Sequence, residues 1–322
     1  MPLDAQTEAL LAQSAENSAP LWSLSVEDAR RALKEMSSVL DIRPLPVAET
    51  RDIRVATSHG GDFRLRIYWP ETELRRELPV VLFLHGGGFA LGDVDTHDAT
   101  ARYYCARVGA LVVSVDYRRP PEYKFPIALE DCYAALNWVV DEAKTLGADS
   151  GRIAVAGDSA GGNLAASVCQ LARNRKGPQI CYEVLVYPNV NFDPKAGYPS
   201  RKLFGGGEYF LGQKDIDWLN GLYLDEPLDC LDPRVSPILA EDLSGLPDAL
   251  VITAGFDPLR DEGQEYAQRL RDGGAVVDYR SFDSTIHGFL SFAGVLDAGQ
   301  EGLELVATHL KRAFRSDKTD AN

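Results

Sequence analysis

The sequence carries little positive charge for its length. Its 322 residues contain 33 Lys and Arg against 48 Asp and Glu, which gives a formal net charge of −15 at pH 7. A nucleic-acid ligand requires clustered basic side chains to neutralise its phosphates, and an anionic membrane surface attracts basic segments. The deficit therefore argues against both kinds of partner. The excess of negative charge aids solubility, and an uncharged substrate is indifferent to it.

Paired cysteines and long apolar runs are also missing. The five cysteines are an odd number with no Cys-x-x-Cys spacing, which argues against a disulfide framework and against a zinc ribbon. No run approaches the roughly 20 apolar residues that a membrane span needs. The amino terminus lacks the basic start and apolar run of a secretory signal. We therefore expect a reduced, cytoplasmic, soluble protein without a membrane span.

The common signatures of nucleotide and metal sites are absent as well. The sequence has no Gly-x4-Gly-Lys-Ser/Thr and no Gly-x-Gly-x-x-Gly, so its glycine clusters are poor phosphate-binding loops. It has no His-Glu-x-x-His, the spacing that holds zinc on a helix. We therefore predict neither a cofactor nor a metal.

What the sequence does contain is a serine between two glycines, at 157–161 (Gly-Asp-Ser-Ala-Gly). An apolar, β-like run precedes the motif at 152–156, and a helical pattern follows it at 163–173. Strand, tight turn and helix are the context of a nucleophile elbow, in which a cramped turn presents a serine hydroxyl at the edge of a sheet. The same turn places that hydroxyl near the positive end of a helix. The motif alone is common by chance, and its flanking pattern makes it specific.

Three further segments add the other groups that acyl transfer needs. A glycine-rich segment, 85–89 (His-Gly-Gly-Gly-Phe), directly follows the apolar run 80–84. Asp257 comes just after the apolar run 249–254, and His287 lies between the last predicted strand and the last predicted helix. Glycine loop, serine, acid and histidine follow one another in the chain order of an α/β-hydrolase.

Together these motifs resemble the bacterial hormone-sensitive-lipase-like carboxylesterases. The resemblance extends from about residue 80 to 290, in the family's order, and includes Gly92-Asp93, Tyr117-Arg118, Pro121-Glu122, Phe125-Pro126, Glu130-Asp131, Gly162, the segment from Asp257 to Glu262, and Gly288-Phe289. It implies an α/β-hydrolase with a mostly parallel central sheet, helices on both faces and a helical cap. One departure is Arg119-Pro120, where the family usually has Leu-Ala, and we expect this change to bear on substrate choice.

Each of these groups has a predicted role in ester hydrolysis. We predict that Ser159 is the nucleophile, that His287 is the base that later returns the proton to the leaving alkoxide, and that Asp257 fixes the imidazole tautomer. The negative oxygen of the intermediate needs donors, which we expect from three backbone amides, those of Gly87, Gly88 and Ala160. We expect His85 to orient the glycine loop rather than to touch the substrate.

Other residues compete for two of these roles. The alternative acids are Asp261, Glu262 and Asp283. The first two open a helix, where carboxylates are favoured in any case, and the third lies four residues before His287. The alternative bases are His59, His97 and His309. We favour Asp257 because it ends a buried strand, and His287 because of its position in the chain order.

The pattern of strands and helices predicts the organisation of the chain. Strands are expected at 53–55, 63–69, 80–84, 111–116, 152–157, 182–187, 249–254 and 275–282, and helices at 98–108, 127–146, 162–174, 261–272 and 299–314. Such alternation implies a largely parallel sheet with helices on both faces. We interpret 1–50 as an N-terminal helical cap segment, 51–188 as the first part of the hydrolase core, 189–247 as a cap insertion and connection, and 248–322 as the second part of the core. The alternating run 63–69 is typical of an edge strand, and the continuous run 80–84 of a central one.

The insertion is far longer than a crossover requires and is rich in aromatic residues, which favours a lid over the active site. We predict substrate contacts from the following side chains: Phe89, Phe204, Tyr209, Phe210, Trp218 and Phe289.

The function that these features favour is a serine carboxylesterase for small, uncharged esters with short- to medium-chain acyl groups. An amidase or peptidase on the same fold, or a hydrolase-fold protein that binds a small ligand, is the alternative, although His287 weighs against a mere binding protein. The last predicted strand is expected to be an edge, so a homodimer through it is a further hypothesis.

Overall fold

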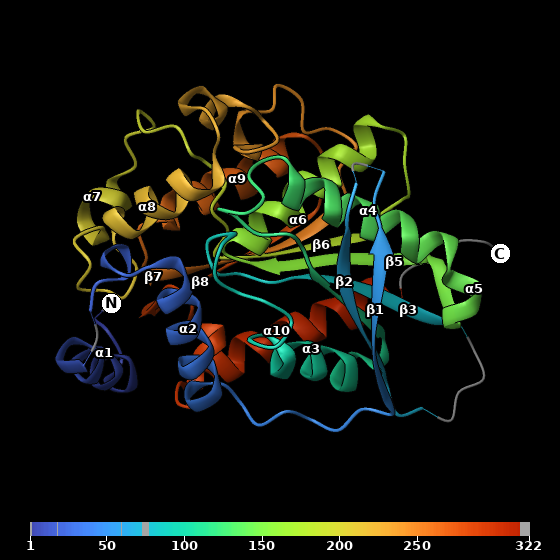
Figure 1. Ribbon diagram of the computed structural model, residues 1–322, viewed down its shortest axis with the longest axis horizontal. Helices are drawn as coiled ribbons and strands as arrows, with labels where there is room; N and C mark the ends of the chain where they lie inside the picture. Colours follow the sequence, from blue (N-terminus) through green and yellow to red (C-terminus); the bar gives the residue numbers. More distant parts are fainter. Residues whose placement is uncertain (1, 18, 59, 73–76, 316–322) are drawn as a thin grey trace.

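An eight-stranded sheet runs through the centre of the molecule, in the order β1-β2-β4-β3-β5-β6-β7-β8 (Figure 1). The computed structural model describes residues 2–17, 19–58, 60–72 and 77–315. The pairs β1–β2 and β2–β4 are antiparallel, and every later pair is parallel. The strands are β1 Glu49–Ala56, β2 Asp62–Trp69, β3 Leu78–Leu84, β4 Leu111–Asp116, β5 Ala148–Asp158, β6 Tyr182–Val186, β7 Asp248–Phe256 and β8 Val277–Ile286.

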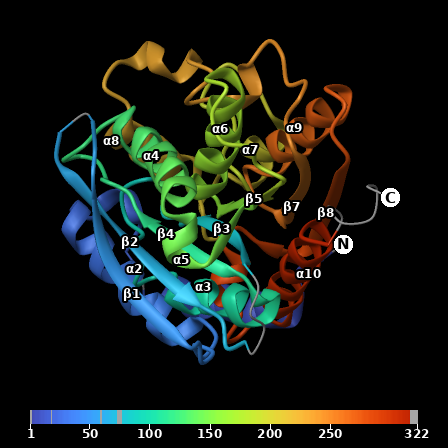
Figure 2. The same ribbon diagram turned by 90° about the vertical axis from the view of Figure 1, so that its right-hand side faces the viewer.

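Helices cover both faces of this sheet, which confirms the predicted fold class. In Figure 2, α4, α6 and α9 lie on one side of the strands, and α3 and α10 lie on the other. The helices of these layers are α3 Asp98–Tyr104, α4 Ile127–Asp141, α5 Ala143–Leu146, α6 Ala160–Asn174, α9 Arg260–Asp272 and α10 Asp297–Ala313. Two predicted helices are shorter than expected. The helix predicted at 127–146 breaks at Glu142 into α4 and α5, and that predicted at 98–108 ends at Tyr104 before a π-turn, Cys105–Gly109.

The strand predicted at the edge of the sheet is not at the edge. Strand β2 pairs with β1 on one side and with β4 on the other, so β1 is the edge strand. The alternation of buried and partly exposed residues along β2 shows that one face of the strand is buried and the other is partly open. It does not show which strands lie beside β2 in the sheet. Strand β3, in contrast, is buried along its whole length between β4 and β5, as its continuous apolar run predicts. At the other end of the sheet, β8 is the edge strand, although no described contact tests a homodimer there.

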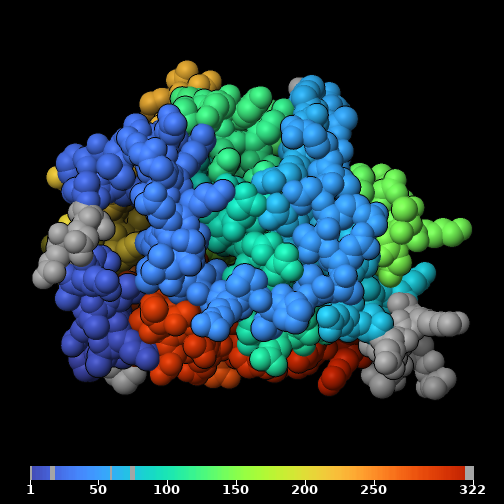
Figure 3. Space-filling view, turned by 60° about the horizontal axis from the view of Figure 1, so that its bottom comes forward, coloured from blue at the N-terminus to red at the C-terminus, as the bar shows by residue number. Residues whose placement is uncertain are grey.

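Helices from the N-terminal segment and from residues 189–247 lie at one end of the molecule, on the left in Figure 1. They are α1 Ala5–Asn17, α2 Val26–Leu40, α7 Pro199–Phe204 and α8 Gln213–Tyr223. The same two segments contain short helical turns at Leu21–Ser23, Pro227–Leu231 and Pro237–Leu239, and a further short turn follows β8 at Phe289–Phe292. Helices α2 and α8 share an apolar cluster with Ala90 and Leu91, which follow the carboxyl end of β3. Figure 3 shows the blue N-terminal segment lying across this end beside part of the yellow one. Among the described residues, no helix combines the length and the apolar character needed to cross a lipid bilayer.

Strand β6 places a carboxyl group in the middle of the sheet. Glu183 is paired between Val155 of β5 and Ala249 of β7 and has no exposed surface. Neither of its carboxyl oxygens has a well-formed hydrogen bond in the described part of the chain, and a weak contact with the Cys169 thiol lowers the pKa of Glu183 less than burial raises it. Burial therefore raises the pKa of Glu183 from its ordinary value of 4.5 to about 8.

The substitution Glu183→Gln is expected to stabilise the protein at pH 8 and to change little below pH 4.5. Between these values the folded wild type holds a proton that the unfolded chain has lost, so its stability falls as the pH rises, by up to about 1.4 kcal/mol per pH unit. A glutamine has no such proton, and the gain at pH 8 should reach a few kcal/mol, on the order of the shift itself. Urea unfolding of both proteins across this range measures the difference. The exposed Glu301→Gln serves as the control, and a gain from Glu183→Gln that did not vary with pH would contradict the proposal of a buried neutral acid.

Candidate active site

The carboxyl ends of four parallel strands bring the predicted site segments to one edge of the sheet. Strand β3 ends directly before the glycine loop, β5 before Ser159, β7 before Asp257 and β8 before His287. Since parallel strands all end at the same edge, segments as distant in the sequence as those of His85 and His287 meet there.

The turn at Ser159 has the strained geometry of a nucleophile elbow. Its backbone angles are φ 54° and ψ −116°, a region that residues with a side chain rarely adopt. A Cβ atom on Gly157 would collide with the carbonyl of Gly161, and one on Gly161 would collide with the carbonyl of Leu84. The Ser159 amide donates to the carbonyl of Val186 at 2.8 Å, which fixes the turn against β6. The two glycines of the motif are therefore required by close approach of backbone to backbone.

The side chains of Ser159, His287 and Asp257 form a single hydrogen-bonded line. The Nε2 atom of His287 lies 2.9 Å from Oγ of Ser159, and Nδ1 lies 2.8 Å from Oδ2 of Asp257. The other carboxylate oxygen of Asp257 accepts the amide of Leu259 at 2.8 Å, and Asp257 has no exposed surface. The ring of Tyr187 lies against the imidazole, with 4.7 Å between the ring centroids. Both the orientation of the carboxylate and that of the imidazole are thus fixed by fully packed surroundings.

The alternative acids have other partners. Asp261 accepts the amide of Ser200, Glu262 accepts two amides and the guanidinium of Arg201, and Asp283 bonds to the hydroxyl of Ser281. Among the alternative histidines, His309 lies against Tyr182 and Asp278, and His97 lies against Asp158. His59 lies outside the described residues.

The glycine loop that follows β3 leaves its amides open. Gly87 and Gly88 have φ values of 101° and 57°, which favour glycine. Within the described part of the chain, the amides of Gly87, Gly88 and Ala160 donate to no backbone or side-chain acceptor. A Cβ atom on Gly88 would also collide with Leu219 of α8. The loop therefore carries free donors and is covered by a helix of the inserted segment.

His85 packs against the start of this loop, and its role in orienting the loop stays a prediction. It is fully buried, its ring is stacked on Tyr117 with centroids 4.2 Å apart, and its Nδ1 lies 2.9 Å from the carbonyl of Gly86. Burial and the charge of His97 lower the pKa of His85 to about 3, so the ring is neutral at pH 7.

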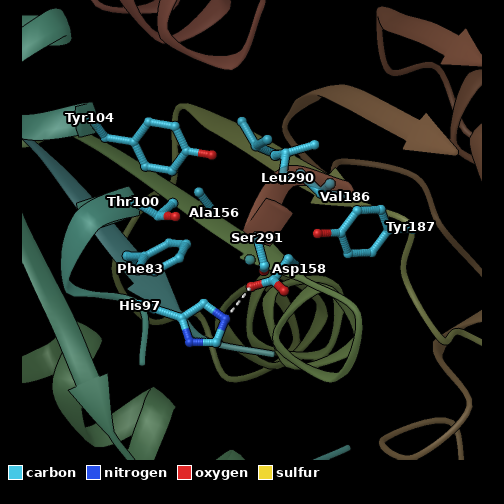
Figure 4. Close-up of a pocket in the computed structure, with 12 residues that line it drawn as sticks. Phe83, His97, Thr100, Tyr104, Ala156, Asp158, Val186, Tyr187, Leu290 and Ser291 are labelled. Carbon is cyan, nitrogen blue, oxygen red and sulfur yellow. Dashed lines mark ion pairs between the residues drawn. The ribbon is translucent and has the colours of Figure 1, made fainter. Parts of the chain in front are cut away.

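Asp158, which directly precedes Ser159, forms a buried ion pair with His97 in the cavity shown in Figure 4. The carboxylate of Asp158 accepts the amide of Gly86 at 2.9 Å and lies 3.4 Å from Nε2 of His97. Burial lowers the pKa of His97, but Asp158 and other carboxylates outweigh burial and raise it above its usual value. Burial likewise raises the pKa of Asp158, yet the charge of His97 and the loop amide outweigh this and lower it. Both shifts favour the ionised forms.

The same cavity has about 10 Å³ of space open to the centre of a water molecule, which is room for one. Tyr187 directs its hydroxyl into this cavity, which the side chain of Ser291 also lines (Figure 4). The sequence motifs include Asp158 but assign it no role, and nothing in the local pattern links it to His97.

The structure separates the six predicted aromatic contacts into two groups. Phe89 and Phe289 are fully buried: the first is stacked on Tyr223 with centroids 3.9 Å apart, and the second packs against Tyr187 and Phe282. Trp218 belongs to the apolar cluster between α2 and α8.

The other three lie beside the acid and histidine segments. Phe204 and Tyr209 pack on Phe256, which precedes Asp257, and the half-exposed ring of Phe210 lies against Phe292 and close to Gly288. Within the described ranges, no group of three or more His, Cys, Asp or Glu side chains is arranged to hold a metal ion.

Comparison with known proteins agrees with this architecture. The family model of the α/β hydrolase fold matches residues 81–291. The chain is 40% identical to esterase LipI of Mycobacterium tuberculosis over 284 residues, 87% of each protein. It is 47% identical to carboxylic ester hydrolase LipN of the same organism over 244 residues, which are 73% of this chain and 64%, just under two thirds, of LipN.

A solved structure extends the likeness over almost the whole chain. The hyperthermophilic esterase of the archaeon Pyrobaculum calidifontis superposes with a TM-score of 0.89 at 41% identity and covers 97% of this chain and 99% of its own. The fold and the line of serine, histidine and aspartate at the carboxyl edge of the sheet define an α/β hydrolase. Within that class, the chain belongs to the hormone-sensitive-lipase-like carboxylesterases.

Proposed function

We propose that the protein hydrolyses small, neutral carboxylic esters through an acyl-enzyme on Ser159. The observation that carries the proposal is the hydrogen-bonded line from Ser159 through His287 to Asp257. In the first step His287 removes the hydroxyl proton as the Ser159 oxygen bonds to the ester carbon. The tetrahedral intermediate then expels the alkoxide, which takes that proton from His287.

The second half of the cycle repeats the first with water. His287 accepts a proton from water, the hydroxide oxygen bonds to the acyl carbon, and Ser159 leaves with the proton restored. Asp257 keeps Nδ1 of His287 protonated throughout, so Nε2 is the nitrogen that accepts the proton. The negative charge of Asp257 stabilises the imidazolium that results.

In each intermediate the negative oxygen is stabilised by the amides of Gly87, Gly88 and Ala160. We infer that these amides face the developing oxyanion before the reaction begins. Because they donate to no backbone acceptor among the described residues, they need little reorganisation when the charge develops. Each such donor is worth about 3–4 kcal/mol of barrier in comparable sites.

We infer that the N-terminal segment and residues 189–247 act as the lid over this site. Leu219 of α8 covers Gly88, and α2 and α8 pack together above the residues that follow the glycine loop. Phe204, Tyr209 and Phe210 supply an apolar wall beside Asp257 and His287, which suits an uncharged acyl group of short to medium length.

A series of p-nitrophenyl esters from acetate to laurate tests the proposal, with a matched p-nitroanilide as the amide comparison. We expect turnover on the shorter chains, a decline toward laurate, and much slower cleavage of the anilide. Stoichiometric labelling of Ser159 by an organophosphate should stop turnover. A folded protein that cleaves no chain length would refute the esterase, and equal rates on ester and anilide would favour an amidase.

A further inference from the structure

The guanidinium of Arg119 binds the segment that directly follows the glycine loop. Arg119 lies in the loop that follows β4, and its Nη1 donates to the carbonyl of Gly92 at 2.6 Å and to that of Leu91 at 3.3 Å. The side chain is about three-quarters buried, and the carboxylate of Asp93 lies 3.9 Å away. Arg119 is one of the two residues, with Pro120, at which the sequence departs from the family pattern. Its guanidinium hydrogen bonds go to backbone carbonyls.

Residues 91 and 92 lie directly against the start of the same loop. A Cβ atom on Gly92 would collide with the carbonyl of Gly86, and one on Gly87 would collide with the amide of Gly92. The carbonyl of Gly87 also accepts the amides of Ala90 and Leu91, at 3.2 and 2.9 Å. Because nothing separates these backbone segments, a displacement of residues 91–92 must shift Gly87.

A second arginine holds the preceding carbonyl. Nε of Arg30, on α2, donates to the carbonyl of Ala90 at 2.8 Å, while its terminal nitrogens bind the carboxylate of Glu122 at 2.7 and 2.8 Å and the carbonyl of Pro120 at 2.8 Å. Two guanidinium groups from distant parts of the chain therefore hold three successive carbonyls, those of residues 90, 91 and 92.

We propose that Arg119 is a positioning residue that fixes the oxyanion-hole amides of Gly87 and Gly88 by holding the carbonyls of Leu91 and Gly92. This inference rests on the proposed function, since it assigns those amides to the developing oxyanion. A rigid, planar guanidinium on a long stem donates to two carbonyls at once, whereas an aliphatic side chain donates to neither. Arg119 itself touches no reacting atom. Its effect should therefore appear in the transition state, where the negative oxygen exists, and not in the binding of the neutral ester.

The test compares Arg119→Met, which keeps most of the stem, with Arg119→Lys, which keeps the positive charge and one donor nitrogen. A matched control is Arg173→Met: Arg173 also donates to two loop carbonyls, those of Ser244 and Asp242, at the opposite edge of the sheet. Active sites are counted by titration with an organophosphate, so that misfolded protein does not lower the apparent rate. The kcat and KM on p-nitrophenyl acetate are then measured per active site, together with the urea midpoint.

We expect Arg119→Met to lower kcat per active site about 10- to 100-fold, as a shift of the order of 1 Å in a catalytic group does, with KM changed less than about threefold. Arg119→Lys should recover part of the loss, and Arg173→Met should leave kcat unchanged. An unchanged kcat in Arg119→Met would overturn the proposal, as would a rise in KM alone, which would place Arg119 in substrate binding. A wild type that neither turns over the ester nor reacts with the organophosphate would instead defeat the proposed function.

Discussion

Replacement of Ser159 by alanine is expected to abolish ester turnover, with a loss of kcat on the order of a millionfold. The substitution removes the only oxygen that Nε2 of His287 contacts in the hydrogen-bonded line, so no acyl-enzyme can form. The folded structure should survive because the strained turn is set by Gly157 and Gly161, whose close backbone contacts do not involve the hydroxyl. Steady-state kinetics on p-nitrophenyl acetate measure the loss, and the urea midpoint checks the fold.

A matched control is Ser281→Ala, an exposed serine on β8, which should keep wild-type kcat. Mass spectrometry of each protein after organophosphate treatment gives an independent readout, since the label should be absent from Ser159→Ala and present in the control. Near-wild-type turnover by Ser159→Ala would show that another nucleophile carries the reaction.

The meeting of the site segments could be predicted because it follows from two local patterns. The continuous apolar run of β3 and the run before Ser159 mark buried parallel strands, and such strands end at one edge of a sheet. Each of the four site segments directly follows a strand. Their meeting at one edge of the sheet can therefore be predicted without knowing how the side chains pack.

Strand neighbours and helix breaks could not be predicted in the same way. The alternation of apolar and polar residues along β2 reveals which of its faces is exposed to solvent. It does not reveal that β2 is the second strand from the edge, because that position depends on the pairing of β2 with the whole length of β1. The break between α4 and α5 at Glu142 likewise interrupts an apolar helical pattern without any proline or glycine to mark it.

The directions in which side chains point around the site were the hardest feature to predict from the sequence. Phe89 is adjacent to Gly88 in the sequence, yet its ring turns into the core and stacks on Tyr223. Arg119 was visible as a departure from the family pattern, but its bonds to the carbonyls of Leu91 and Gly92 join residues 27 or 28 positions apart. Such orientations are set by contacts between distant segments, so a local pattern can mark the residue and still leave its partner undetermined.

Replacement of Asp257 by asparagine is expected to lower kcat about 10⁴-fold while the shape of the site is kept. One carboxylate oxygen accepts the amide of Leu259, and the other accepts Nδ1 of His287. An asparagine that keeps the first bond turns its NH₂ group toward Nδ1, which must then accept a hydrogen bond. The imidazole proton moves to Nε2, and His287 faces Ser159 as a donor that can no longer remove its proton.

This substitution also decides between the acids that the sequence left open. Asp283→Asn is the matched control, because Asp283 is exposed and lies four residues before His287 in the chain. Its hydrogen bond is to the Ser281 hydroxyl, so kcat should stay within about twofold of wild type, as for other surface changes away from a site. Slow organophosphate labelling of Ser159 should accompany Asp257→Asn and not Asp283→Asn. If Asp283→Asn lost turnover while Asp257→Asn kept it, the role of orienting His287 would belong to Asp283, and the contact between Asp257 and Nδ1 of His287 would have no part in catalysis.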